Sequence, residues 1–295
     1  MLGFVPCNCN LTKYYLTQNK RDNPCGYPFY FFVLDICFFV VYNKKVKKKQ
    51  HVWSEKRTMI PEIKEKLVKE YPHLTELHAH SYPVSSCSEF RAEELAQVYR
   101  KTGVSAMVLT NHFTPKHLEG KSKEAFVGEY IEAYREFRHY AEEAGICAIF
   151  GMELRFSENN NDYLLYGIDE GDAYRIADYV EAGLARFRAE FAREGYLLIQ
   201  AHPKRSGMVD MPLEFLDGYE AFNMHPGHNS RVGISSRIAH EAGLIVTGGT
   251  DFHHPTHEGV CLLRTREKLT SSHDVARALR SGDYVLDIGG SIVLP

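Results

Sequence analysis

The chain has 295 residues, which is enough for one large α/β domain or for two ordinary domains. Its formal net charge is −3, but residues 1–58 carry an excess of seven positive charges and the remainder carries an excess of ten negative charges. The acidic balance of the larger part disfavours a protein that binds long nucleic acids, because such proteins present a basic surface.

Residues 1–58 lack the pattern of a folded domain. Within residues 27–49 an apolar run is followed by five lysines, an order that also occurs at membrane anchors. The run is short for a membrane span and contains a proline and an aspartate, so membrane contact through this segment is disfavoured. The positive charge follows the apolar run and no small-residue cleavage site is evident, which argues against a secretory signal. We expect a poorly structured extension, and a functional domain over residues 59–295.

From residue 59 onward, apolar strand-like runs alternate with helical stretches, which is typical of βα units around a mostly parallel sheet. The expected strands lie at 74–80, 105–112, 147–154, 163–168, 196–202, 219–225 and 244–248. The expected helices lie at 91–101, 123–144, 173–194 and 274–280. Seven strands alternating with helices favour a barrel over an open sheet, although periodicity alone does not decide closure.

Side chains that can bind metals stand at the ends of nearly all these strands. His78 and His80 close the first strand, and residues two apart in a strand share a face, so both imidazoles should point to one place. Asp251 and His253 repeat this spacing after the seventh strand. The strands between them end in His112, Glu153, Asp169, His202 and His225.

The carboxyl ends of parallel barrel strands gather at one edge, where such barrels carry their chemistry. We therefore expect the imidazoles and carboxylates to converge on a shared site. This ligand mixture suits two or three divalent ions of zinc, manganese or iron, because magnesium alone would favour fewer nitrogen ligands.

Five short motifs, taken in order, resemble the successive motifs of the PHP superfamily (polymerase and histidinol phosphatase). They are Glu-Leu-His-Ala-His at 76–80, Leu-Thr-Asn-His at 109–112, Gly-Met-Glu at 151–153, Ala-His-Pro at 201–203 and Gly-Thr-Asp-Phe-His at 249–253. The resemblance covers about residues 72–290. It implies a distorted seven-stranded (β/α)7 TIM-like barrel whose metal centre, at the carboxyl ends of the strands, hydrolyses phosphoesters.

The resemblance also implies which residues bind each of three ions. The first set is His78, His80, Glu153 and Asp251. The second set is Glu153, His202 and Asp169, and the third is His112 and His253. The chain departs from the usual motifs in having Asp169 and Asn111 where histidine and aspartate are common. It also has Ser86 and Cys87 where histidine or aspartate is common, so these two are the candidates to complete the third set.

The expected reaction is hydrolysis of a phosphate ester of a small metabolite, such as histidinol phosphate or a nucleotide, by a metal-bridged hydroxide. Glu153, Asp251 and His202 are the expected catalytic residues. Arg205 and Arg231 are candidates to clasp the phosphate, and His225 is a candidate substrate contact. Solvated positions at the rim, or a turn for His225, are the structural alternatives.

Three other functions remain open from the sequence. An exonuclease would need a basic track, which the acidic core disfavours. An amidohydrolase-type barrel would carry a lysine at the end of a middle strand, and none stands there. A non-catalytic, metal-stabilised module is the third. Cys87, Cys147 and Cys261 lie in the body of the chain and suggest reduced thiols and a cytoplasmic protein.

Overall fold

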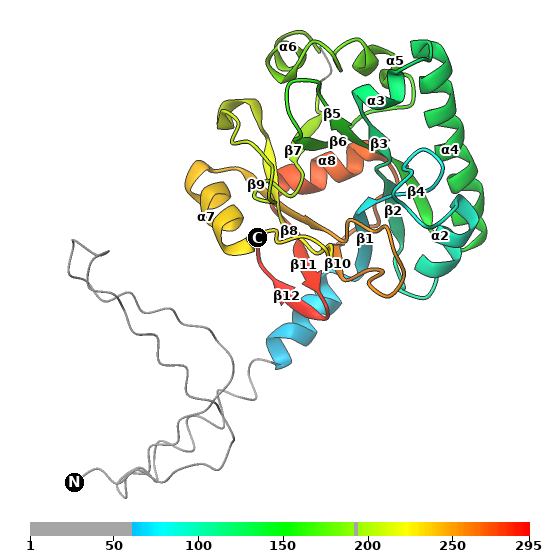
Figure 1. Cartoon of the computed structure of the whole chain (residues 1–295). Helices are drawn as coiled ribbons and strands as arrows, with labels where there is room; N and C mark the ends of the chain where they lie inside the picture. Colours follow the sequence, from blue (N-terminus) through cyan, green and yellow to red (C-terminus); the bar gives the residue numbers. More distant parts are fainter. Residues whose placement is uncertain (1–60, 192–193) are drawn as a thin grey trace, which may run out of the picture. The chain divides into compact units, whose positions relative to one another are not determined.

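The computed structural model describes residues 61–191 and 194–295 (Figure 1). The expected N-terminal extension, including residues 27–49, lies outside the described residues. In the part of the chain that is described, no helix is both long enough and apolar enough to cross a membrane. The described residues form a mixed α/β fold with two six-stranded sheets.

The first sheet has the strand order β12-β11-β10-β1-β2-β4. Its strands are β1 (His73–Ala79), β2 (Ala106–Leu109), β4 (Cys147–Phe150), β10 (Cys261–Thr265), β11 (Val285–Ile288) and β12 (Ser291–Val293). The second sheet has the order β3-β5-β6-β7-β8-β9. Its strands are β3 (His112–Phe113), β5 (Met152–Arg155), β6 (Asp162–Tyr166), β7 (Leu197–Gln200), β8 (Gly218–Asn223) and β9 (Ile245–Gly249).

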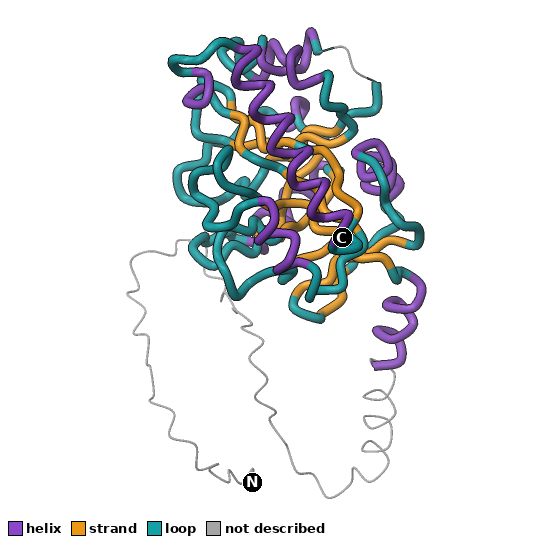
Figure 2. The backbone as a smooth tube through the Cα atoms, turned by 90° about the vertical axis from the view of Figure 1, so that its right-hand side faces the viewer, coloured by secondary structure: helices purple, strands orange, loops and turns teal. Residues whose placement is uncertain are grey.

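The strands lie inside, with helices and loops around them (Figure 2). The helices are α2 (Ala92–Tyr99), α3 (Pro115–Leu118), α4 (Lys123–Glu143), α5 (Asp172–Ala177), α6 (Leu184–Glu190), α7 (Val232–Ala242) and α8 (Ser272–Ser281). Residues 61–70 are also helical, and Leu213–Phe215 form a short 3₁₀ turn.

Local sequence explains where the main helices begin and end. The Ser122 hydroxyl accepts a hydrogen bond from the Ala125 backbone N–H at the start of α4, and Ser271 caps α8 in the same way. Gly282 ends α8 with a φ of 69°, a left-handed conformation that favours glycine.

The direction of β6 decides which residues reach the carboxyl ends of its neighbours. β1, β2 and β4 run parallel to one another, and so do β7, β8 and β9. β6 runs antiparallel to both β5 and β7, with Asp162 opposite Arg155. The first residue of β6, rather than the last, therefore lies beside the end of β5.

The two sheets adjoin through consecutive strands and through a short backbone link. Only Gly151 separates β4 from β5, and a Cβ atom there would lie 2.4 Å from Val108 Cγ1, so glycine allows this close approach. His80 N–H donates to the Phe252 carbonyl and Phe252 N–H donates to the His78 carbonyl, both at 3.2 Å. The strand pairing gives two sheets and no closed barrel among the described residues, so the expected fold is confirmed only as mixed α/β.

The structure differs from the expected elements in several places. The expected strands at 105–112 and 147–154 are each divided, into β2 and β3 and into β4 and β5. The single helix expected at 173–194 is divided into α5 and α6, because Gly183 takes a φ of +87° that a continuous helix does not allow. Three strands near the C-terminus, β10, β11 and β12, were not expected, and they pair antiparallel beside β1.

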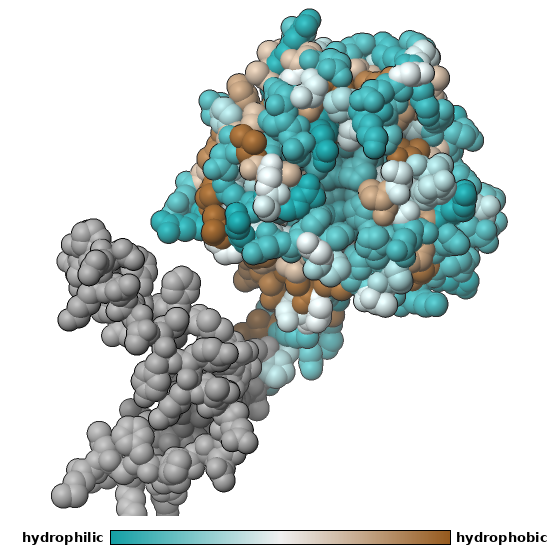
Figure 3. Space-filling model, in the orientation of Figure 1, coloured by the Kyte–Doolittle hydropathy of each residue, from teal (hydrophilic) through white to brown (hydrophobic). Residues whose placement is uncertain are grey.

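The hydrophobic core has two clusters. The larger includes the apolar faces of α2 and α4, among them Tyr99, Phe126 and Phe137, and the smaller includes the inner face of α8 with Val275 and Leu279. Each fully buried aromatic or leucine side chain contributes roughly 1.5–3 kcal/mol to folding. The face shown in Figure 3 is mostly hydrophilic.

Candidate metal centre

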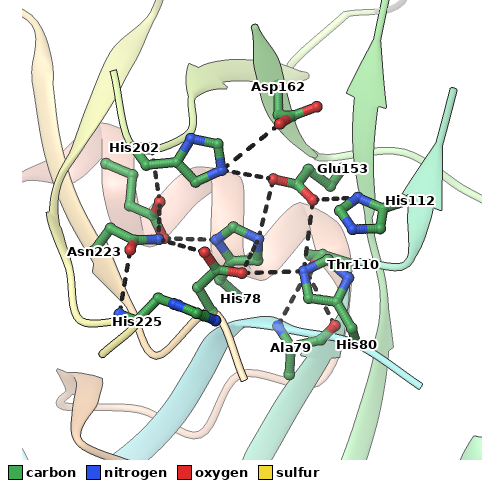
Figure 4. Close-up of polar contacts among 12 residues, drawn as sticks. His78, Ala79, His80, Thr110, His112, Glu153, Asp162, His202, Asn223 and His225 are labelled. Atoms are coloured by element: carbon green, nitrogen blue, oxygen red, sulfur yellow. Dashed lines mark hydrogen bonds and ion pairs between the residues drawn. The ribbon is translucent and has the colours of Figure 1, made fainter. Parts of the chain in front are cut away.

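His78, His80, Glu153 and Asp251 meet at one point, as Figure 4 shows for the labelled side chains. His78 Nε2 lies 3.3 Å from Glu153 Oε1 and 3.4 Å from Asp251 Oδ1. His80 Nε2 lies 3.4 Å from the same Asp251 oxygen and 3.5 Å from Glu153 Oε2. All four side chains are buried, and the period-two spacing at the end of β1 brings the two imidazoles to one face.

The other ring nitrogen of His78 and of His80, Nδ1, faces a hydrogen-bond acceptor that lies away from the shared point. His78 Nδ1 lies 2.8 Å from Glu220 Oε1. His80 Nδ1 lies 3.2 Å from Ser85 Oγ, whose own proton is donated to Asn111 Oδ1. Acceptors in these places hold one ring proton on Nδ1, so both rings turn Nε2 toward the shared point.

A second group contains Glu153, Asp162 and His202, whose ligand atoms all lie within 4.8 Å of one another. His202 Nε2 lies 3.2 Å from Glu153 Oε1 and 3.7 Å from Asp162 Oδ2 (Figure 4). Asp162 was not among the residues expected from the sequence. It reaches the group because β6 begins at this edge of the sheet.

Asp169, the ligand expected at the end of strand four, lies elsewhere. Its side chain is 62% exposed and lines a cavity of about 330 Å³ with residues such as Tyr134 and Ser271. The expectation assumed that β6 runs parallel to its neighbours. Because β6 is antiparallel, its end lies at the opposite edge of the sheet, and Asp162 occupies the place expected for Asp169.

A third group contains His80, His112 and His253. The His80 ring stacks on both others, with ring centroids 4.4 Å from His112 and 4.3 Å from His253. His253 Nδ1 lies 2.9 Å from the Asp251 carbonyl oxygen, so its Nε2 is also left bare. Cys87 borders this group, with its sulfur 3.2 Å from His112 Nε2.

Glu220 in β8 supports two of the groups from behind. Its Oε1 faces His78 Nδ1, and its Oε2 accepts hydrogen bonds from the His202 backbone N–H at 3.0 Å and from Asn223 Nδ2 at 2.9 Å. Asn223 Nδ2 also donates to Asp251 Oδ2 at 3.0 Å. Such outer contacts orient ligands and set their tautomers. The sequence analysis did not identify Glu220.

The charges at the centre shift each other's ionisation. Burial alone would lower the pKa of His78, but the carboxylates of Glu220 and Asp251 raise it well above its usual value. Burial alone would raise the pKa of Glu153, but the imidazoles of His112 and His78 hold it well below its usual value. The Glu153 carboxylate is therefore ionised at neutral pH and attracts positive charge.

Several buried polar atoms at the centre have no hydrogen-bond partner among the described residues. They include His78 Nε2, His80 Nε2, His112 Nδ1 and Glu153 Oε2. A buried polar atom without a partner costs about 1–3 kcal/mol. Bare imidazole nitrogens beside buried carboxylates are the ligands that divalent ions take, so the residues present fit divalent metal ions.

Two of the ligands hold a strained backbone. His202 and Asp251 have φ values of 32° and 53°, in the left-handed region that non-glycine residues rarely adopt. His202 lies just after β7 and Asp251 just after β9. The left-handed turn of the backbone at each position directs the side chain back toward the centre.

The centre opens into a cavity of about 230 Å³. Arg205 and His225 line it, and so does His228, which the sequence also offers as a substrate contact beside His225. Arg155 lines it as well and was not expected. Arg155 forms a two-point ion pair with Asp162 at 2.7 and 2.8 Å. This pairing explains how a ligand at the start of β6 is oriented.

Arg231 does not join these residues. Its backbone has a φ of 47° at the start of α7, its side chain is exposed, and it is not among the residues that line the cavity. The expectation that Arg231 clasps the phosphate is therefore not supported by its position. Arg155 is the second guanidinium that lines this cavity.

No protein-family model matches the chain, and no curated protein matches its sequence. Solved structures do match in fold. PsfC from Pseudomonas syringae is 17% identical, with a TM-score of 0.50 over 69% of this chain and 87% of that chain. A two-domain protein from Bacteroides vulgatus, described as containing a predicted PHP-like metal-dependent phosphoesterase, is also 17% identical, with a TM-score of 0.50. The match covers 75% of this chain and 66% of that one. At these identities the likeness is one of fold alone.

Proposed function

We propose that this chain is a metal-dependent hydrolase that cleaves the phosphate ester of a small metabolite, such as histidinol phosphate or a nucleotide. The observation that carries the proposal is the position of Glu153. Its Oε1 faces His78 and His202, while its Oε2 faces His80 and His112. One carboxylate thus links the three ligand groups, an arrangement suited to neighbouring ions.

Two or three ions of zinc, manganese or iron are the cofactors that these ligands support. Bound at these residues, such ions would lower the pKa of coordinated water toward neutrality and neutralise charge on the phosphoryl oxygens. Asp251, Glu153 and His202 hold the ligand positions from three different strands. Their rigid placement, with Glu220 and Asn223 behind them, keeps the ligand atoms in register for one substrate.

The cavity residues supply the contacts to the substrate. Arg205 lies at its edge, 3.4 Å from both Asp162 Oδ2 and His228 Nε2, and its planar guanidinium suits a phosphate. Burial lowers the pKa of His225 to about 4, so its ring is neutral at pH 7. His225 Nδ1 accepts a hydrogen bond from Gly227 N–H at 3.0 Å, which places the proton on Nε2 as a donor toward the substrate.

The experiment measures hydrolysis of 4-nitrophenyl phosphate by the full chain after reconstitution with zinc, manganese or iron(II). A panel of phosphorylated metabolites follows on the best preparation. Glu153→Gln should abolish turnover. Asp162→Asn should lower turnover by ~10–100-fold or more, since changes beside metal ligands typically cost that much. Asp169→Asn is the matched control, because this aspartate lies away from the centre.

Two results would contradict the proposal. If metal-loaded protein cleaves no phosphate ester, the chain is a non-catalytic metal-stabilised module. If Asp169→Asn loses as much activity as Asp162→Asn, the ligand assignment is wrong.

A further inference from the structure

The loop between β1 and α2 is fastened to the third ligand group by hydrogen bonds on both sides of Cys87. Ser85 Oγ accepts from the His112 backbone N–H at 2.9 Å, and Glu89 N–H donates to the His253 carbonyl at 2.9 Å. Ser85 is fully buried. The exposed Cys87 is therefore held at the rim of the centre by its neighbours in the loop.

The sulfur is placed as a ligand atom would be. It lies 3.2 Å from His112 Nε2, and Cys87 and His253 line the same cavity. In a tetrahedral zinc site, a sulfur at ~2.3 Å and a nitrogen at ~2.0 Å from the ion are separated by about 3.5 Å. The thiol thus lies at the distance from His112 Nε2 that two ligands of one ion would have.

A second observation points to a cation at the same place. His80 Nε2, in the same group as His112 and His253, is fully buried and has no hydrogen-bond partner among the described residues, while His112 Nδ1 faces Glu153 Oε2 at 2.6 Å. The ring of His112 is thus turned edge-on between a carboxylate and a thiol (Figure 4 shows its carboxylate side). A ring in this position can bind an ion through Nε2 while Nδ1–H faces the carboxylate.

We propose that Cys87, His112 and His253 form a thiolate-containing metal subsite that selects zinc or another thiophilic divalent ion over magnesium and manganese. The inference rests on the proposed metal-dependent function, and it specifies the ligands of one of the proposed ions. Thiolate favours soft or borderline ions, whereas hard ions prefer oxygen. Three protein ligands leave a fourth position open to substrate or water, as in catalytic zinc sites. The sulfur binds as the thiolate, and any proton that it carries is released to solvent.

The test is cobalt(II) titration of the full chain, read by absorption. A cobalt–thiolate bond gives a near-ultraviolet charge-transfer band that cobalt–imidazole bonds do not give. The variants are Cys87→Ser and Cys87→His, with Cys147→Ser as the matched control for a thiol that lies away from the centre. Metal content after zinc loading is measured in parallel by mass spectrometry, and circular dichroism checks that each variant is folded.

The inference expects a difference band between wild type and Cys87→Ser, together with loss of about one zinc per chain. Cys87→His should restore the zinc but not the band, and Cys147→Ser should match wild type. Equal spectra and equal zinc content in wild type and Cys87→Ser would overturn the inference, and Cys87 would then be a thiol without a bound ion.

The two proposals fail separately. If the wild type cleaves phosphate esters and Cys87→Ser shows an unchanged cobalt spectrum, the subsite is wrong and the proposed function stands. If the band depends on Cys87 but no ester is cleaved, the subsite stands and the proposed function is wrong.

Discussion

At the scale of single residues, Glu220 shows how far the centre depends on groups that touch no ligand position directly. Its two oxygens accept from the His78 ring, the His202 backbone and Asn223, while the side chain is completely buried. These contacts fix the tautomer of one ligand and the backbone of another. Glu220 therefore acts through His78 and His202, as a positioning residue.

Glu220→Gln should weaken metal binding by about 10–100-fold. An amide offers only one accepting oxygen, so the amide –NH₂ would face either His78 Nδ1–H or the donors on His202 and Asn223. The measurement is zinc affinity by competition with a chromogenic chelator. Glu214→Gln, at an exposed position in the 3₁₀ turn, is the control and should leave the affinity unchanged. An unchanged affinity in Glu220→Gln would show that the contact is incidental.

Cys87 and Cys147 should differ in reactivity in the metal-free protein. Burial alone would raise the pKa of Cys87, but hydrogen bonds from His112 and His253 lower it to about 6. Burial raises the pKa of Cys147. Only the thiolate is alkylated, so Cys87 should reach half its maximal iodoacetamide rate near pH 6 and Cys147 only above the pKa of an ordinary thiol. Peptide mass spectrometry measures each site, and equal pH profiles would contradict the prediction.

The sequence predicted which side chains of the compact motifs come together, and it missed those whose role depends on distant contacts. His78 and His80, and likewise Asp251 and His253, could be found because a strand places residues two apart on one face. Glu220 could not, because its partner His78 is 142 residues away in the chain and nothing in the sequence around Glu220 points to that contact.

At the scale of elements, the reversed β6 explains the one expected ligand that lies elsewhere. Alternation of apolar residues identifies a strand but not its direction. A signal was present in the connection, since residues 156–161 include three consecutive asparagines and are too few for a crossover between parallel strands, which needs about a dozen residues. A hairpin-like connection would have placed Asp162, rather than Asp169, at the centre.

The close packing of β9 against β1 and β8 should make Gly249 irreplaceable. A Cβ atom there would lie 2.5 Å from His78 Cβ and 2.6 Å from Glu220 Oε1. Gly249→Ala should displace His78, and a shift of about 1 Å can cost ~100-fold in activity. Hydrolysis of 4-nitrophenyl phosphate is the measurement.

Gly233→Ala in α7 is the matched control, because no atom lies within 4 Å of the added Cβ. Alanine in a helix should raise the free energy of unfolding by about 0.5–1 kcal/mol there and leave activity intact. Equal activity in the two variants would show that the strand contact tolerates a methyl group.

At the scale of the whole molecule, metal binding and proton binding compete for the same buried groups. Carboxylates raise the pKa of both His78 and His112 well above the usual histidine value, against the effect of burial. These rings therefore keep a proton at neutral pH in the metal-free protein and must lose it to bind an ion. Zinc affinity should rise with pH through and beyond about 6.5.

Calorimetry in buffers of different protonation enthalpy measures both the affinity and the protons released. His112→Gln should reduce the pH dependence, whereas His139→Gln, on an exposed position of α4, should not. A pH-independent affinity would contradict the expected linkage.

The general architecture could be predicted more completely than its closure. Alternating strand and helix patterns correctly indicated an α/β fold, and the polar strand ends correctly indicated where side chains converge. The antiparallel additions β10 to β12 were missed because their pairing partners are distant in the chain. Whether strands close into a barrel depends on pairing between the first and last strands, which no local pattern encodes.

The left-handed backbones of His202 and Asp251 have a consequence for the evolution and engineering of this scaffold. Each unfavourable conformation costs roughly 1–3 kcal/mol, a penalty that glycine would remove at the expense of the side chain. Selection for heat resistance alone would therefore favour glycine at positions 202 and 251, where the proposed reaction needs the imidazole and the carboxylate. A heat-stable variant that has lost its activity should therefore carry glycine in the turns after β7 and β9.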